Sequence, residues 1–188
     1  MGLTSTLIGH NGGPTMEAGF SWRKHAWTAA RARLLPTLPI EVVRLRVKRA
    51  AELGLDYRTY AGVRASTGHD VVAFLFSSNA LRVTAGRPGM TAERASRLAA
   101  IRSCQRIALA VSPLQAPALL QANPALDQAH PAPHALARHR DIAATLRAAL
   151  GNLPSDRVIL VGDMALERDW CAAGRLAAYL PADRYFPA

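Results

Sequence analysis

Two apolar segments of the chain end in polar side chains that can bind a ligand. The segments span residues 71–76 and 157–163, and both are rich in large or β-branched side chains. In open α/β sheets, ligands gather at the carboxyl ends of the strands. The candidate ligand-binding positions at these two ends are Ser77, Ser78, Asn79, Gly162 and Asp163, and a third apolar segment, 106–113, adds Ser112. The structural alternative is that Asp163 caps a following helix and that residues 77–79 form a turn.

Basic side chains provide a second kind of chemistry. The chain carries a formal net charge of +10, and residues 21–64 hold ten Lys or Arg against three Asp or Glu, which is +7 of that total. Twenty-one of the 23 basic residues are Arg, whose planar five-donor head suits phosphate better than an ammonium group does. A one-sided basic region is the electrostatic pattern expected of a nucleic-acid-binding protein. The alternative is a solvated basic face without a partner.

The other reactive side chains do not form a site by their spacing. Cys104 and Cys171 lie 67 positions apart, outside any C-x-x-C pair, which argues against a disulfide framework or a zinc cage. Prolines interrupt the histidines within residues 130–139, so they lack helical metal-binding spacing. No Ser/His/Asp or Cys/His set can be assembled from the linear sequence. We therefore predict no catalytic residue, metal or cofactor.

The apolar spacing predicts the elements that position these groups. The short apolar runs 71–76, 106–113 and 157–163 are typical of strands buried on both faces of a parallel sheet. Helical segments separate them, and a further helix is expected over 165–180, an alternation typical of α/β folds. The proline-rich segment 113–134 predicts a long connection with at most short helical turns. We expect a small three-layer α/β fold with at least three mainly parallel strands, preceded by a basic helical segment.

Composition divides the chain into three regions. Residues 1–20 are rich in Gly and predict a flexible N-terminal arm. Residues 21–68 predict a basic helical segment, in which a helix over 39–53 stops at Gly54. Residues 69–188 predict the sheet region, forming one compact unit with 21–68. Because no apolar run approaches the roughly 20 residues of a membrane helix, and no signal-peptide pattern opens the chain, we expect a cytoplasmic, bacterial-type protein without a membrane span.

The stretch AAELGLDYRTYAGVR (residues 50–64) resembles the helix-turn-helix family of DNA-binding motifs. Ala50 or Ala51 would let two helices approach, Gly54 would make the turn, and Asp56 would cap the second helix. The residues expected to face the interior are Leu55, Tyr60 and Val63. In that family the second helix lies in the major groove. The resemblance implies that the nucleic-acid-binding residues are Arg44, Lys48, Arg49, Tyr57, Arg58, Thr59 and Arg64.

Two other segments resemble haloacid dehalogenase-like hydrolases. FLFSSNA is similar to their second motif, which holds a phosphate, and VILVGDMALE is similar to their fourth. The resemblance implies that Asp163 and Glu167 hold magnesium through oxygen ligands. The family's nucleophilic Asp lies in a D-x-D pattern on an earlier strand, and no such pattern occurs upstream of Ser78. Without that nucleophile the covalent phosphoryl-enzyme route is unavailable.

These observations favour a non-catalytic nucleic-acid-binding or regulatory accessory protein, with DNA or RNA bound by the basic helix-turn-helix-like segment. Two alternatives stay open. One is a phosphate- or nucleotide-handling α/β protein that uses Ser77, Ser78, Asn79, Asp163 and Glu167. The other is a protein-interaction module, in which the 50–64 unit is an ordinary pair of packed helices and the partner is another protein.

Overall fold

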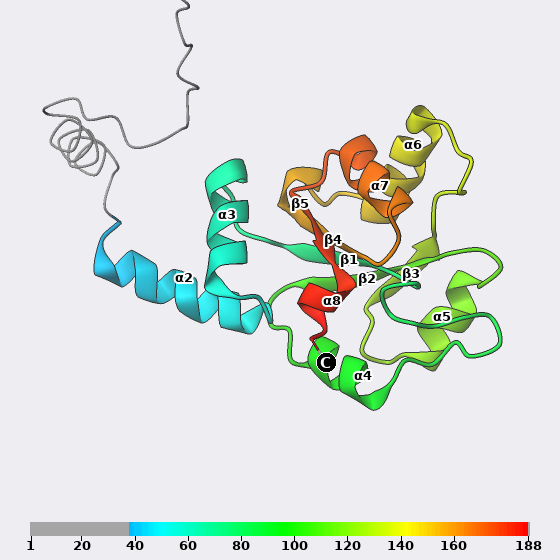
Figure 1. Ribbon diagram of the computed structural model, residues 1–188, viewed down its shortest axis with the longest axis horizontal. Helices are drawn as coiled ribbons and strands as arrows, with labels where there is room; N and C mark the ends of the chain where they lie inside the picture. The colour runs from blue at the N-terminus through cyan, green and yellow to red at the C-terminus, as the bar shows by residue number, and fades with distance from the viewer. Residues whose placement is uncertain (1–37, 188) are drawn as a thin grey trace, which may run out of the picture. The chain divides into compact units, whose positions relative to one another are not determined.

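The computed structural model describes residues 38–187, and its centre is a parallel β-sheet with helices on both faces (Figure 1). The sheet has five strands in the order β3-β2-β1-β4-β5, and all neighbouring strands are parallel. The strands are β1 (Ala73–Ser77), β2 (Gln105–Ala110), β3 (Gln128–Pro131), β4 (Val158–Gly162) and β5 (Ala178–Pro181). The predicted α/β fold with at least three parallel strands is therefore confirmed.

In the described part of the chain two helices precede the sheet, and the others connect its strands or follow the last one. The helices are α2 (Ile40–Glu52), α3 (Tyr57–Thr67), α4 (Ala92–Ala99), α5 (Ala116–Ala122), α6 (His139–Leu150), the 3-10 turn η1 (Ser155–Arg157), α7 (Leu166–Gly174) and α8 (Ala182–Tyr185). From Glu41 onward the chain forms one compact unit, so α2 and α3 belong with the sheet. The arm predicted over residues 1–20 lies outside the described residues.

Side chains of the central strands alternate between two apolar layers, as the period of a strand requires. On one face, Phe74 and Phe76 of β1 pack against Tyr185 of α8, with ring centroids 5.3 and 5.6 Å from the Tyr185 ring. On the other face, Leu75 lies in a cluster with Leu146 of α6 and Trp170 of α7. Figure 1 shows α6 and α7 on one side of the sheet. Burial on both faces is why β1, β2 and β4 carry continuous apolar runs.

The two outer strands correct the sequence-based prediction. The connection predicted over 113–134 contains β3 as well as α5. The helix predicted over 165–180 ends at Gly174, and β5 begins at Ala178, inside the range predicted as helical. Both outer strands have four residues and are only partly buried. A short strand that lies at the edge of a sheet carries neither a continuous apolar run nor a long alternation, so its pattern is weak.

The strand order places a topological switch point between β1 and β4. From β1 the chain builds the sheet outward through β2 to β3, and it then returns to the other side of β1 to add β4 and β5. Connections therefore leave the carboxyl ends of β1 and β4 in opposite directions, and open α/β sheets bind ligands in the crevice that this leaves. Among residues 38–187, no helix is long and apolar enough to cross a membrane.

Candidate functional site

The turn between α2 and α3 has the local geometry predicted for the helix-turn-helix-like unit. Gly54 has a φ of 68°, in the left-handed region that suits glycine. The backbone N–H of Leu55 donates to the carbonyl of Ala50 at 2.9 Å, and that of Gly54 donates to Ala51 at 3.0 Å, which is the Schellman pattern of a helix end. Asp56 then caps α3 by accepting from the Thr59 N–H at 2.9 Å. The residues found buried as predicted are Ala50, Leu55, Tyr60 and Val63.

Arg49 connects α2 to the amino end of the sheet. Its Nε donates to Asp70 at 2.9 Å, and its Nη1 donates to Glu52 at 3.2 Å. The remaining N–H groups donate to the backbone carbonyls of Val71, Arg102 and Ser103. A guanidinium has five donors, and all five are used inside the protein by a side chain only 16% exposed. In this conformation Arg49 has no donor left for a phosphate.

The hydroxyls of Thr59 and Tyr60 on α3 are also bonded within the protein. Tyr60 Oη donates to Asp70 at 2.9 Å, and burial raises the pKa of Tyr60, with Asp70 raising it further. Thr59 Oγ1 donates to Asp56 and accepts from Arg184 Nη2 at 3.1 Å. Thr59 is therefore held by its neighbours, and Tyr57 at the start of the helix is half-buried.

Three of the predicted nucleic-acid-binding cations extend into solvent. Arg44 is 72% exposed and lies 3.5 Å from Glu41 on the same helix, an ion pair that stabilises little at such exposure. Lys48 and Arg58 are also exposed, whereas Arg64 is half-buried. Arg58 and Arg64 are six residues apart, which places them roughly 120° apart around α3. They therefore do not form one row on that helix.

The carboxyl ends of β1 and β4 hold the five residues assigned to the phosphate-handling alternative, which are Ser77, Ser78, Asn79, Asp163 and Glu167. Glu167 of α7 is fully buried. Its Oε1 accepts from Asn79 Nδ2 at 2.9 Å, and its Oε2 accepts from the N–H groups of Asp163 at 2.6 Å and Met164 at 3.0 Å. Gly162 leaves the space for this carboxylate, because a Cβ there would lie 2.5 Å from Oε2. Both oxygens of Glu167 are thus engaged by the protein.

The serines at the end of β1 hold the chain as it leaves the sheet. Ser77 Oγ accepts from the Ala80 N–H at 3.0 Å, so the predicted turn forms here. Ser78 Oγ accepts from the Val111 N–H at 3.0 Å and ties the ends of β1 and β2 together. Asp163 is exposed and its side chain accepts no hydrogen bond from α7, so the predicted helix cap is wrong. Glu167, inside α7, instead binds the N–H groups of Asp163 and Met164 that precede the helix. Within residues 38–187 no group of three or more His, Cys, Asp or Glu is placed to hold a metal ion.

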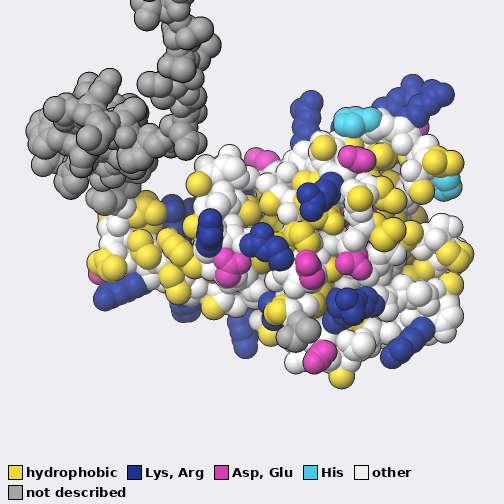
Figure 2. Space-filling view, in the orientation of Figure 1, with side chains coloured by type: hydrophobic (Ala, Val, Ile, Leu, Met, Phe, Trp, Pro, Cys, Tyr) yellow, Lys and Arg dark blue, Asp and Glu magenta, His cyan; other side chains and the backbone are white. Residues whose placement is uncertain are grey.

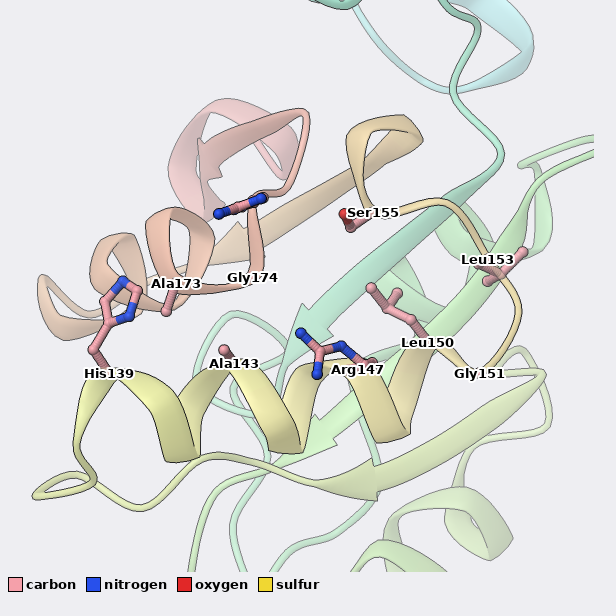
Figure 3. Close-up of a pocket in the computed structure, with 10 residues that line it drawn as sticks. His139, Ala143, Arg147, Leu150, Gly151, Leu153, Ser155, Ala173 and Gly174 are labelled. Carbon is pink, nitrogen blue, oxygen red and sulfur yellow. The ribbon is translucent and has the colours of Figure 1, made fainter.

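A surface groove between α6 and α7 is a third candidate (Figure 3). Its volume is about 480 Å³, and it is lined by His139 and Arg147 of α6, Ser155 of η1, and Gly174. Figure 3 shows His139 and Arg147 on the side of α6 that faces α7. Both of these side chains are exposed, so neither is a buried charge. The lining includes Ser155, just before β4, and the groove therefore lies apart from the switch point at the carboxyl end of that strand.

Three arginines that no sequence pattern indicated lie together near the carboxyl end of β1. Arg82, Arg94 and Arg97 line one pocket of about 550 Å³, together with Phe186. They come from the turn after β1 and from α4, and Phe186 comes from the end of the chain. No spacing along the sequence predicts this meeting, because tertiary packing alone brings the segments together. Compared with models of known families, with curated proteins and with solved structures, the chain matches none.

Proposed function

We propose that the protein binds nucleic acid through phosphate contacts made by the exposed cations of α2 and α3. The observation that carries the proposal is the pair of helices joined at Gly54, from which Arg44, Lys48 and Arg58 extend into solvent. Arg44 and Lys48 are four residues apart, so they lie on the same side of α2. Arginine and lysine side chains with this exposure suit backbone phosphates.

The surface of α3 favours contacts to the nucleic-acid backbone over base reading. Apart from Arg58, its exposed positions are Gly62, Ala65 and Ser66, whose side chains are short or absent. Thr59 is bonded to Asp56 and Arg184, and Tyr57 and Arg64 are half-buried. Base discrimination needs several side chains that reach into a groove, and Arg58 is the one long side chain that α3 exposes. We therefore expect binding with little sequence preference.

A triple variant with Arg44→Gln, Lys48→Gln and Arg58→Gln removes the three exposed cations of α2 and α3. Fluorescence anisotropy with labelled duplex DNA and labelled single-stranded RNA should show weaker binding for this variant than for the unaltered chain. Each phosphate that a cation neutralises releases counterions, so the slope of log affinity against log salt on duplex DNA should become shallower by about 0.9 for every phosphate that is no longer neutralised. Circular dichroism would verify that the helices remain folded.

A matched control removes three cations from another surface. Arg138, Arg140 and Arg147 are all exposed and lie at or within α6, and changing each to Gln alters the net charge by the same amount. This control should keep the salt slope close to that of the unaltered chain. Equal losses of affinity in the two triple variants would mean that overall charge governs binding, and the proposal would be abandoned.

A protein partner is the second candidate, because α2 also exposes large apolar side chains. Ile40 and Val47 are 61% and 47% exposed, and their spacing of seven places them on one side of the helix. Figure 2 shows hydrophobic side chains beside Lys and Arg along α2. Exposed apolar clusters of this kind mark interaction surfaces. A complex that survives about 1 M salt, where charges are screened within roughly 3 Å, and that is lost in Ile40→Ser and Val47→Ser would favour this candidate.

A further inference from the structure

The pocket formed by Arg82, Arg94 and Arg97 lies beside the switch point of the sheet. Arg82 belongs to the turn that follows β1, and Arg94 and Arg97 lie one helical turn apart on α4. Arg94 donates to the carbonyl of Ala80, which lies in the same turn after β1. Arg82 and Arg94 therefore place one side of the pocket near the carboxyl end of β1, and open α/β sheets bind ligands at the carboxyl ends of their strands.

Arg94 is a buried cation that has no anionic partner among residues 38–187. The residue is only 9% exposed. One of its nitrogens, Nη1, donates to the carbonyl of Ala80, and its Cζ lies 4.3 Å from the centroid of the Phe186 ring. In the described part of the chain, no carboxylate forms an ion pair with it. Burial lowers the pKa of Arg94, and the charge of Arg82 lowers it further. Buried charges are normally paired, so an unpaired guanidinium that lines a pocket points to a ligand.

Arg97 repeats this arrangement one turn later. Its Nη2 donates to the carbonyl of Gly54 at 3.0 Å, and its Cζ lies 5.1 Å from the centroid of the Tyr185 ring. Its Nε is buried and finds no acceptor among the described residues. Both guanidinium groups are thus fixed by an aromatic ring and a backbone carbonyl, with N–H groups left over. Cations oriented in advance lose little side-chain entropy when an anion binds.

Arg82, from the turn after β1, adds a third positive charge to the pocket lining. It is exposed, and its φ of 54° lies in the left-handed region that non-glycine residues rarely adopt. Hydrogen bonds around it, from Leu81 N–H to Ser77 and from Val83 N–H to Ser78, hold the turn in this shape. Backbone conformations of this kind cluster at ligand-binding sites. Glu93 is the one carboxylate among the described lining residues. These residues therefore carry a net charge of about +2, which matches the phosphate dianion present at neutral pH.

We propose that this pocket binds the phosphoryl group of a small phosphorylated molecule. The guanidinium groups of Arg94 and Arg97 offer paired N–H donors of the geometry that phosphate oxygens accept, and Arg82 closes over the anion. The volume of about 550 Å³ is that of a small-ligand site. Phe186 and Pro187 provide an apolar wall for the remainder of the molecule. The proposal rests on residues other than those proposed to contact nucleic acid.

The test uses inorganic phosphate as the probe and the full chain as the protein. Phosphate is titrated at pH 7.5 and constant ionic strength, and binding is followed by ¹H–¹⁵N spectra that include the arginine Nε–H signals. Saturable shifts should appear in residues 82–100 and in the Nε–H signals of Arg94 and Arg97. Sulfate, which is also a dianion, should compete, whereas acetate should bind at least about tenfold more weakly because it carries one charge.

Two variants and one control decide the outcome. Arg82→Gln should weaken phosphate binding by at least about tenfold, because it removes one positive charge. Arg94→Lys should weaken it by a similar factor, because Lys keeps the charge but lacks the paired planar N–H donors of Arg. Arg87→Gln makes the same charge change in the same connection, outside the pocket, and should alter binding by less than about twofold. The Arg82 side chain is exposed and donates no hydrogen bond to the described residues, so Arg82→Gln remains decisive if Arg94→Lys fails to fold. The proposal fails if phosphate shows no saturable binding below roughly 10 mM, or if Arg87→Gln weakens binding as much as Arg82→Gln.

Discussion

Glu167 shows how a charged side chain can be part of a core. Its carboxylate is fully buried and accepts three hydrogen bonds, from Asn79 Nδ2 and from the N–H groups of Asp163 and Met164. These bonds join the end of β1 to the start of α7 across the switch point. A buried carboxylate is tolerated only when such bonds replace its hydration. The residue implied as a magnesium ligand by the hydrolase resemblance therefore has a structural role in this conformation.

Replacing Glu167 by Gln should destabilise the protein by about 2 to 3 kcal/mol. The amide group of Gln carries one oxygen in place of two, so an NH₂ group would face either the N–H groups of Asp163 and Met164 or the NH₂ of Asn79, and bonds to a charged acceptor are each worth about 1.5 to 3 kcal/mol. The measurement is the free energy of unfolding in urea.

A double-mutant cycle with Asn79→Ala checks that the effect arises at this hydrogen bond. The two substitutions should be coupled by about 0.5 to 3 kcal/mol, as expected of residues that share a hydrogen bond. Glu93 is exposed and accepts no hydrogen bond from the described residues, and Glu93→Gln should change stability by less than about 0.5 kcal/mol. If the Glu167 and Glu93 variants were equally stable, the structural role of the buried carboxylate would be refuted.

At the scale of elements, the joint between α2 and α3 depends on one backbone conformation. Gly54 turns the chain with a φ of 68°, and the side of the turn away from solvent meets Tyr185, whose Oη donates to the Leu53 carbonyl at 3.1 Å. Arg49 of α2 reinforces the joint, because it donates to Asp70 before β1 and to the carbonyls of Arg102 and Ser103 before β2. The two helices are thus fixed to the sheet, so their exposed cations have a defined arrangement.

Two glycine variants should change the stability of the protein in opposite directions, one at this joint and one inside α3. Gly54→Ala should destabilise the protein by about 1 kcal/mol or more, because alanine is strained in the left-handed region and its Cβ would lie 3.3 Å from Tyr185 Oη. Gly62→Ala lies inside α3 with nothing within 4 Å of the added Cβ, so it should stabilise the protein by about 0.5 to 1 kcal/mol. Thermal unfolding followed by circular dichroism distinguishes them, and a gain of stability in Gly54→Ala would contradict the assigned turn.

At the scale of the whole molecule, ion pairs link elements that lie far apart in the sequence. Arg106 at the start of β2 donates to Asp127 just before β3, with Nη2 2.6 Å from Oδ1. The hydrogen bonds from the Arg106 side chain lower the pKa of Asp127, although its partial burial acts in the opposite direction. The side-chain hydrogen bond from Thr59 lowers the pKa of Asp56. Both carboxyls therefore bind protons more weakly in the folded chain than in the unfolded chain.

This difference predicts acid sensitivity. A carboxyl with a lowered folded pKa contributes stability above its unfolded pKa of about 3.9, and that contribution is lost as the pH falls through the folded pKa. These two groups should leave the free energy of unfolding unchanged between about pH 5 and 7 and reduce it below about pH 4. Urea unfolding at several pH values measures the effect, and Asp127→Asn should lower stability at pH 7 and flatten part of the acid-induced decrease. If acid lowered the free energy of unfolding of Asp127→Asn as much as that of the unaltered chain, Asp127 would be ruled out as a contributor to the acid sensitivity.

The sequence alone determined the central strands, the α/β class and the α2–α3 turn. β1, β2 and β4 are buried on both faces, so their apolar side chains are continuous in the sequence, and Gly54 and Asp56 act on neighbouring residues. Tertiary structure decided the rest. The edge strands β3 and β5 depend on a neighbour for their hydrogen bonds, and Arg49 finds its acceptors in segments up to 54 positions away. The arginine pocket needs residues 82, 94, 97 and 186 in one place, and such a convergence follows from packing because no local spacing encodes it.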